Sequence, residues 1–459
     1  MKYKHFKQAL LFKVGSLLLF GWELLLLYYA WHKFNKVFFS PSFYTLSVFA
    51  VSTSLCIYCV NFWQIHFYPI TFFIIGLGLL IMVIAESCFY RKKRLVWKSE
   101  KYLIKLPSMV KIGLSLCCVL ATFMYYREIQ KIGLAHAMGM NEAIANVKED
   151  WELYESQFNP FVRQGYKMVM GIAYCFTFIF VNNFNVCRQK LSDTFWYILP
   201  LFCGVVINLI SGSRGDMIRM LLLFLFTYYI CKWQATNWRI QPSKQIIKVA
   251  FPAIALVLSI FFMARLFVKV DVENQKNIGG PVEYLAYYIG SPIQVFNIHA
   301  EQLQRHSDAN AYSSFGVASF GGVYSLLQNL NIIEKKDIKY HKIGVGFEEL
   351  GGASNAAGNV DTIFSCPYVD FGLIGMCIYI YIIYAVLSYF FYRNILYESL
   401  SIKYIKFFII FSFFFYEVEM SFYSDVINII ISQTGILQFF CLLILMHYII
   451  RSKYLVRVG

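Results

Sequence analysis

The chain has 459 residues, of which 59% are hydrophobic, 19% aromatic and only 15% charged. A soluble domain carries about 25% charged residues, so this composition excludes an ordinary soluble protein and indicates a protein of the lipid bilayer. The formal net charge of +15 does not indicate nucleic-acid binding, because the basic residues gather in short loops between apolar runs, as membrane topology requires.

Apolar runs long enough to cross a bilayer recur along the whole sequence. They predict about eleven membrane-spanning helices, at residues 11–31, 43–62, 69–90, 108–127, 165–184, 196–210, 217–233, 249–267, 369–392, 404–420 and 427–450. The expected fold class is all-α, a polytopic helical membrane protein with 11 or 12 spans and one large outer-face loop between the eighth and ninth. The expected organisation is therefore N-terminal spans over residues 1–267, the loop over 268–368 and C-terminal spans over 369–459.

The charges of the loops orient these spans. The loop at residues 91–105 carries seven basic residues and one acidic residue, so we expect it in the cytoplasm. Counting spans onward places the C-terminus in the cytoplasm and two acidic segments outside, at residues 141–163 and 268–368. The side of the N-terminus stays open, because eleven spans put it outside whereas its lysines favour the inside. Within the large loop, residues 281–304 predict an interfacial or partly re-entrant helix.

Metal or redox chemistry is not expected. The twelve cysteines lie mostly in apolar runs, where a thiol behaves as a small hydrophobic group. The sequence contains no Asp-x-Asp, His-Glu-x-x-His or clustered Cys/His pattern of the kind that binds metals. We therefore expect neither a metal nor another cofactor.

The junction between the sixth and seventh spans carries an arginine among glycines. It reads Ser211-Gly212-Ser213-Arg214-Gly215-Asp216, and the expected topology places it on the outer face. Backbone amides at a helix start favour anions, so Arg214 with Ser213, Gly215 and Asp216 predicts a site for pyrophosphate or phosphate. The alternative is an arginine that reaches the lipid headgroups beside a glycine turn.

Further candidates follow in the chain. Arg265 closes the eighth span at the outer face, and a second cation there would share the charge of a diphosphate. Arg305 and His306 lie in the large loop, about two helical turns after His299. A histidine near arginines can act as a general base at neutral pH. The alternatives are a snorkelling arginine at the end of a span and ordinary surface residues in the loop.

A polar, glycine-rich segment stands where the chain re-enters the membrane before the ninth span. Its polar side chains would hydrogen-bond sugar hydroxyls, and the candidates are Asn359, Asp361, Thr362, Tyr368 and Asp370. The alternative is that Thr362 and Asp370 only cap the ninth helix.

These segments resemble the O-antigen and capsular polysaccharide polymerases of the Wzy type. The Ser-Gly-Ser-Arg-Gly turn is similar to that family's arginine site. Its re-entry motif is matched by Asn359-Val360-Asp361-Thr362-Ile363-Phe364 and Tyr368-Val369-Asp370-Phe371-Gly372, and Phe39-Ser40-Pro41-Ser42 before the second span also fits. Arg305 stands ten residues before Gly316, as in an arginine-x10-glycine loop pattern, whereas the next glycine after Arg265 is Gly279.

The resemblance implies a metal-independent, GT-C-like glycosyltransferase of the bacterial cytoplasmic (inner) membrane. It would polymerise undecaprenyl-pyrophosphate-linked repeat units into O-antigen of lipopolysaccharide or into capsular polysaccharide. Arg214, assisted by Arg265 or Arg305, would stabilise the departing diphosphate, and His306 or Asp361 would accept the hydroxyl proton. The implied partners are lipid-linked glycans, the bilayer, a chain-length regulator and a flippase, and no nucleic acid.

Two other functions stay open. An O-antigen ligase would use the same donor with a lipid A-core acceptor. A flippase or transporter of lipid-linked oligosaccharides would be no enzyme at all. Transporters commonly contain duplicated halves and broken helices near the bilayer midplane. The absence of an evident repeat and the gathering of polar residues in one outer loop favour an enzyme.

Overall fold

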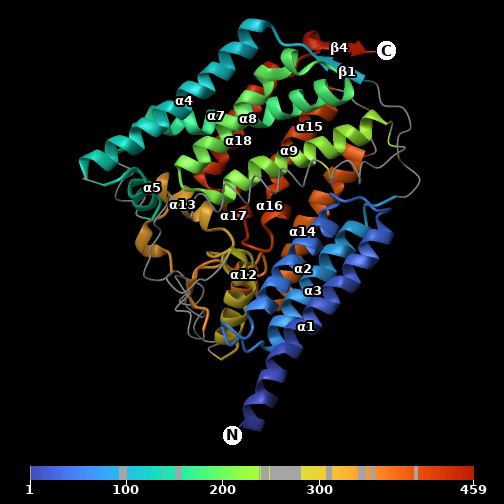
Figure 1. Cartoon of the computed structure of the whole chain (residues 1–459), viewed down its shortest axis with the longest axis vertical. Coiled ribbons are helices and arrows are strands. Elements are labelled where there is room, and N and C mark those ends of the chain that lie inside the picture. The colour runs from blue at the N-terminus through green and yellow to red at the C-terminus, as the bar shows by residue number, and fades with distance from the viewer. Residues whose placement is uncertain are drawn as a thin grey trace. The chain divides into compact units, whose positions relative to one another are not determined.

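A computed structural model of the chain describes residues 2–91, 101–136, 138–149, 157–236, 238, 248, 281–305, 313–339, 348–351, 357–396 and 402–458. The described residues are mainly helical and carry only four short strands (Figure 1). Seven helices among them are long and apolar enough to cross a membrane. This confirms the expected all-α polytopic membrane protein.

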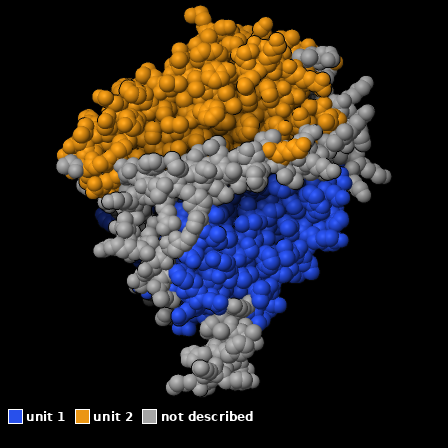
Figure 2. All heavy atoms as spheres, viewed as in Figure 1, with its two compact units in different colours: residues 1–92, 271–392, 414–435 blue, residues 93–270, 393–413, 436–459 orange. Residues whose placement is uncertain are grey.

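The chain divides into two compact units, and neither is one continuous segment (Figure 2). Unit 1 consists of Met1–Lys92, Asp271–Tyr392 and Phe414–Gly435. Unit 2 consists of Lys93–Val270, Arg393–Phe413 and Ile436–Gly459. Each unit thus combines helices from distant parts of the sequence. The units therefore differ from the three consecutive segments expected from hydropathy, residues 1–267, 268–368 and 369–459.

Unit 1 is built on three consecutive membrane helices. They are α1 (Lys2–Lys33), α2 (Pro41–Cys59) and α3 (Pro69–Ser87). A proline at the first position fixes the start of α2 and of α3, because its missing N–H costs nothing in the first turn. The later helix α14 (Ser365–Tyr389), continued by the π-helical η5 (Phe390–Leu396), packs along α3. Figure 1 shows these four helices side by side.

The helix α12 (Pro281–Arg305) lies in the core of unit 1. It packs along α2, and its Ile293, Phe296 and Ala300 are buried in the same hydrophobic cluster as the membrane helices. The segment expected as an interfacial or re-entrant helix is therefore an integral part of the helical bundle. The shorter elements of unit 1 are α13 (Gly321–Asn329), η4 (Lys335–Asp337), β2 (Glu348–Glu349), β3 (Ala357–Gly358), α16 (Tyr416–Met420) and α17 (Ile427–Ile430).

Unit 2 is a second helical bundle. Its helices are α4 (Ser108–Ala135), α5 (Met140–Glu149), α7 (Pro160–Val181) with the π-helical η2 (Asn182–Val186), α8 (Leu191–Ile210), α9 (Arg214–Ala235) and most of α15 (Ile402–Phe414) and α18 (Gln433–Ile449). The pairs α7 with α8, α4 with α7 and α4 with α8 form its centre.

One end of unit 2 gathers three loops that the sequence places in the cytoplasm. Strand β1 (Lys101–Ile104) pairs antiparallel with β4 (Leu455–Val458), the last strand, which follows the 3-10 helix η6 (Ser452–Tyr454). The side chain of Asn183 in η2 bonds both the N–H and the carbonyl of Ile104, at 3.0 and 2.8 Å. Strand β1, the C-terminal tail and the turn after α7 therefore lie at the same end of unit 2.

The turn before Arg214 lies at the opposite end of unit 2. Tyr166 near the start of α7 donates a hydrogen bond of 2.6 Å to Asn208 near the end of α8. Since α7 and α8 each run from one end of the bundle to the other, residues 211–214 stand a full helix length from β1. This arrangement is the one expected from the charges of the loops.

Most expected spans coincide with helices, but the last two are broken. The first six spans and the ninth correspond to α1, α2, α3, α4, α7, α8 and α14. The seventh corresponds to α9, which has 22 residues, and residues 249–267 lie outside the described part of the chain. Instead of the two final continuous spans, α15 is followed by α16, and α17 by α18, with a polar loop between α16 and α17. Buried Glu417 and Glu419 lie in α16 and buried Asp425 lies in the loop, and their need for polar partners opposes a regular apolar helix.

Candidate functional site

A buried histidine joins three segments of unit 1 that are far apart in the sequence. His299, near the end of α12, is only 3% exposed. Its Nδ1 lies 2.7 Å from Oδ2 of Asp361, which precedes α14. Its Nε2 lies 3.4 Å from Oε1 of Glu348 in β2. The imidazole is therefore placed between two carboxylates, and we call these three residues the His299 group.

Local contacts hold both carboxylates in place. Ser365, the first residue of α14, donates its hydroxyl to Oδ2 of Asp361. Gln302, on α12, donates to Oε2 of Glu348 at 3.4 Å. Strand β3 places Gly358 opposite Glu348, and a Cβ at Gly358 would lie 2.6 Å from the side chain of Val295 on α12. A glycine is thus needed for the strand pair to sit on α12 close enough for Glu348 to reach the histidine.

The charges around His299 favour its protonated form. Burial lowers the pKa of a histidine, but the hydrogen bond and charge of Asp361, together with Glu348, outweigh that effect and raise the pKa of His299 above 6.5. An imidazolium between two carboxylates compensates part of their charge. The imidazole of His299 therefore keeps its proton to a higher pH than an ordinary histidine does.

Asp370 of the re-entry segment has a structural role in the described residues. Its carboxylate accepts hydrogen bonds from the backbone N–H groups of Ser319, at 2.7 Å, and Ala318, at 3.3 Å. The turn that presents these amides begins at Gly316, whose φ of +69° favours glycine. The expected alternative, in which Thr362 or Asp370 caps the ninth helix, is not what is found, because Phe364 occupies the N-cap of α14 and no side chain caps it.

The other residues of the re-entry segment differ in their surroundings. Thr362 is fully buried, and its hydroxyl oxygen has no hydrogen-bond partner among the described residues. Tyr368 is half-buried against the hydrophobic cluster of unit 1, and Asn359 is exposed. Of the five residues proposed to bind sugar, only Asp361 belongs to the His299 group.

A further buried carboxylate of unit 1 contacts the middle of α14. Asp425, between α16 and α17, is 3% exposed and accepts a hydrogen bond of 2.9 Å from Tyr379 on α14. Burial is the main cause that raises its pKa to about 7; the bonds from Tyr379 and the amide of Ile427 act against it, and the charges of Asp370 and Asp361 add to it. Sequence reasoning missed this residue, although an aspartate that interrupts an apolar run was a usable signal.

The other cationic candidates, Arg265, Arg305 and His306, have separate outcomes. Arg305 is the last residue of α12, its side chain is 67% exposed, and it forms an ion pair with Glu301 one turn earlier. It lies at the same end of α12 as His299. Arg265 and His306 lie outside the described residues.

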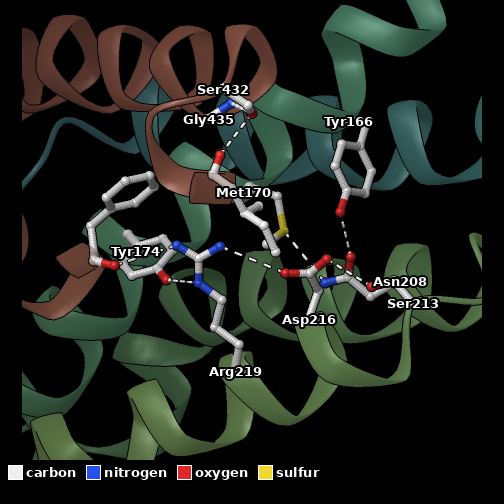
Figure 3. A network of polar contacts seen from close by, with 11 residues as sticks. Tyr166, Met170, Tyr174, Asn208, Ser213, Asp216, Arg219, Ser432 and Gly435 are labelled. Atoms are coloured by element: carbon white, nitrogen blue, oxygen red, sulfur yellow. Dashed lines mark hydrogen bonds and ion pairs between the residues drawn. The ribbon is translucent and has the colours of Figure 1, made fainter. Parts of the chain in front are cut away.

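The Arg214 turn belongs to unit 2 and contains a polar network of its own (Figure 3). Gly212 has a φ of +71°, and Arg214 is the first residue of α9, although its side chain lies outside the described part of the structure. Ser213 donates a 2.7 Å hydrogen bond to Asp216, one turn into α9. Gly215 lies inside the same first turn, so Ser213, Gly215 and Asp216 form the turn from which Arg214 emerges.

Arg219 forms an ion pair with Asp216 and neutralises its charge. Its guanidinium lies 3.6 Å from the Asp216 carboxylate and donates a 2.6 Å hydrogen bond to the hydroxyl of Tyr174. The same group lies over the rings of Tyr174 and Phe413, at 5.4 and 4.9 Å from their centres (Figure 3). Arg219 is 4% exposed, so it is a packing residue of unit 2 that neutralises Asp216.

Within the described ranges, no group of three or more His, Cys, Asp or Glu side chains is arranged to hold a metal ion. In the His299 group, the imidazole stands between the carboxylates instead of sharing a common point with them. No protein-family model, curated protein or solved structure matches the chain. The resemblance of its short motifs to a polymerase family therefore stays a prediction.

Proposed function

We propose that this chain is a membrane glycosyltransferase that polymerises undecaprenyl-pyrophosphate-linked repeat units into O-antigen or capsular polysaccharide. The proposal depends chiefly on the His299 group, in which Asp361 of the re-entry segment meets a histidine of α12 inside a helical membrane protein. Buried charged groups are costly in such a protein and usually serve a function. Glycosyl transfer to a sugar hydroxyl needs a proton acceptor of this kind.

The proposed reaction is a single displacement. The acceptor hydroxyl oxygen attacks the anomeric carbon of the lipid-linked glycan, and the bond from that carbon to the diphosphate oxygen breaks. Undecaprenyl pyrophosphate leaves with the electron pair, and the hydroxyl proton passes to a carboxylate of the enzyme. Arg214, assisted by Arg265 or Arg305, stabilises the negative charge that develops on the diphosphate. One such preorganised donor contributes on the order of 3 kcal/mol.

The arrangement of unit 2 supports the outer face as the place of reaction. The Arg214 turn lies at the end of the bundle opposite β1 and the C-terminal strand. If the basic loop before β1 is cytoplasmic, as its charge predicts, Arg214 meets the membrane surface on which lipid-linked glycans are assembled. The cytoplasmic membrane of a bacterium is accordingly the proposed location.

The function is tested with the purified full-length protein in lipid nanodiscs. The substrate is lipid-linked oligosaccharide extracted from a bacterial host strain that lacks this protein. A ladder of products on a gel supports the polymerase. Transfer of one glycan to lipid A-core and no ladder would instead identify a ligase. No transfer, combined with movement of the glycan across vesicle membranes, would identify a flippase.

Arg214 is tested in the same assay. We expect Arg214→Ala to abolish the ladder while the protein is still inserted in the membrane and leaves single repeat units unused. Arg214→Lys is also expected to be poor, because an ammonium group cannot contact two phosphate oxygens as a guanidinium fork does. The matched control is Lys190→Ala, which removes an exposed cation at the opposite end of unit 2. Normal ladders from Arg214→Ala would remove Arg214 from the mechanism.

A further inference from the structure

We infer that Glu348 is the general base of the proposed transfer and that His299 is a positioning residue that joins it to Asp361. The sequence singled out neither residue for this role: Glu348 is one of ten acidic residues of the large loop. This inference rests on the proposed function and adds the residue that receives the acceptor's proton.

Exposure distinguishes the three members of the His299 group. The ring of His299 is 3% exposed, so it is shielded from a sugar substrate. The side chain of Asp361 is 17% exposed, and that of Glu348 is 27% exposed. Glu348 is therefore the member most accessible to the hydroxyl of an acceptor.

Hydrogen bonding also favours Glu348 over Asp361 as the carboxylate that an acceptor hydroxyl can reach. Oδ2 of Asp361 accepts hydrogen bonds from both the imidazole of His299 and the hydroxyl of Ser365. An oxygen that accepts two hydrogen bonds has little capacity left for a substrate hydroxyl. Glu348 has looser contacts, 3.4 Å from Gln302 and 3.4 Å from His299 Nε2, which makes no hydrogen bond within the described residues. Its carboxylate oxygens are thus freer to contact the hydroxyl of an acceptor.

The proton can be followed through one cycle. Before the reaction, the imidazole of His299 lies between the side chains of Glu348 and Asp361. The O–H bond of the acceptor breaks as its oxygen bonds to the anomeric carbon, and the proton moves to Glu348. After the products leave, the exposed carboxyl group of Glu348 returns the proton to water. No oxidant, reductant or further reactant is needed.

The groups that surround His299 determine how removal of its imidazole affects Glu348. The titratable groups that face it from other elements are Glu348 of β2 and Asp361 before α14. Glu301 and Arg305 lie on α12 itself and form an ion pair with each other. Loss of the imidazole removes the contact with Oε1 of Glu348 and the link from Glu348 to Asp361.

The first experiment compares two neighbouring glutamates in the nanodisc assay. Glu348→Gln removes the base with almost no change in shape, and we expect kcat to fall by about 10²–10⁴-fold with little change in KM. Glu349→Gln is the matched control, because Glu349 follows on the same strand and is exposed. Glu348→Asp retains a carboxylate and should be more active than Glu348→Gln. Equal activity of the Glu348→Gln and Glu349→Gln proteins would overturn the inference.

The second experiment measures the pH dependence of the rate. In wild-type protein we expect the rate to depend on the protonation of His299, whose pKa is raised above 6.5 by the two carboxylates. In His299→Gln we expect this dependence to be lost, because the imidazole is absent. A merely structural histidine would lower the amount of active protein without moving the profile. An unmoved profile would therefore overturn the positioning role of His299.

The failure of this inference can be told apart from the failure of the proposed function. Absence of any ladder from wild-type protein removes both. A wild-type ladder that persists unchanged in Glu348→Gln, with the same melting temperature, removes only the assignment of the base.

Discussion

Two arginines five residues apart on α9 have different roles, which their spacing in the sequence does not distinguish. Arg214 begins the helix at a glycine turn, whereas Arg219 lies one turn deeper and is 4% exposed. Arg219 contacts Asp216, Tyr174 and Phe413 within unit 2. We therefore assign stability to Arg219 and keep the proposed chemistry for Arg214.

We expect Arg219→Ala to lower the melting temperature of the purified protein. The substitution removes charge-assisted hydrogen bonds and the cation–π contacts, and we estimate a loss of about 2–3 kcal/mol. The measurement is thermal unfolding in detergent. Lys336→Ala is the control, because Lys336 and Glu334 form an ion pair on the surface with side chains 74% and 67% exposed. Exposed pairs of this kind contribute little. Equal melting temperatures of the two variants would contradict the role of Arg219.

His299 makes the stability of unit 1 depend on pH. Because its pKa is raised in the folded protein, its contribution is fully present below the unfolded pKa of about 6.5 and is lost as the pH rises through the folded value. We expect the difference in melting temperature between wild type and His299→Gln to be largest in acid and to shrink in alkali. A difference that grows with pH would show that the histidine is buried in its neutral form.

The sequence identifies part of this site and not the rest. Asp361 was recognisable because a polar, glycine-rich stretch precedes an apolar run. Its partners were not, since His299 lies 62 residues upstream and meets it only through the packing of α12 beside α14. Periodicity reports which face of a helix is buried, but it does not report which distant segment covers that face.

At the scale of elements, the close approach of α12 to α2 positions His299. Gly290 makes this approach possible, because a Cβ there would lie 2.8 Å from the backbone nitrogen of Cys56 and 3.0 Å from the carbonyl carbon of Leu55. Ser52 on α2 also donates a 2.5 Å hydrogen bond to the carbonyl of Ile289. Small residues at such crossings are typical of membrane helices.

We expect Gly290→Ala to force α12 away from α2. The added methyl group meets backbone atoms that cannot rotate aside, and overpacking of this kind costs about 1–3 kcal/mol. Gly21→Ala on α1 is the matched control, because a Cβ at Gly21 meets nothing within 4 Å. There, the better helix propensity of alanine should slightly stabilise the protein. The measurement is thermal unfolding of both variants. Equal changes in their melting temperatures would exclude close packing at Gly290.

Hydropathy predicted the long helices well and the breaks poorly. The spans that became α2, α3 and α7 were marked by uniform apolar runs and by a proline at each start. The break between α15 and α16 gave no such sign, because the run around Phe415 is as apolar as a continuous helix. The end of α16 depends on a tertiary contact, because the N–H of Ile363 donates a hydrogen bond to the carbonyl of Ser421. α12 was assigned to a loop because its buried polar residues lower its mean hydropathy.

At the scale of the whole molecule, unit 2 places β1 and the C-terminal strand at one end and the Arg214 turn at the other. The paired strands β1 and β4 and the side chain of Asn183 tie the basic loop and the C-terminal tail together. The Arg214 turn lies a helix length away. The alternation of basic and acidic loops predicted this separation, but only the strand pairing shows that β1 and the C-terminal strand lie at the same end of unit 2.

Accessibility of cysteines tests this separation directly. In protein whose exposed Cys88 and Cys117 are replaced by serine, we expect Ser211→Cys to react with a membrane-impermeant maleimide in cells whose outer membrane, if present, has been made permeable. Lys105→Cys should react only after the cytoplasmic membrane is opened, because Lys105 is exposed and its amide bonds the tail at Tyr454. The lipid diphosphate leaves on the outer surface in the proposed reaction. If the cysteine at position 211 reacts only after the cytoplasmic membrane is opened, Arg214 lies on the cytoplasmic side. It then cannot stabilise a diphosphate that leaves on the outer surface.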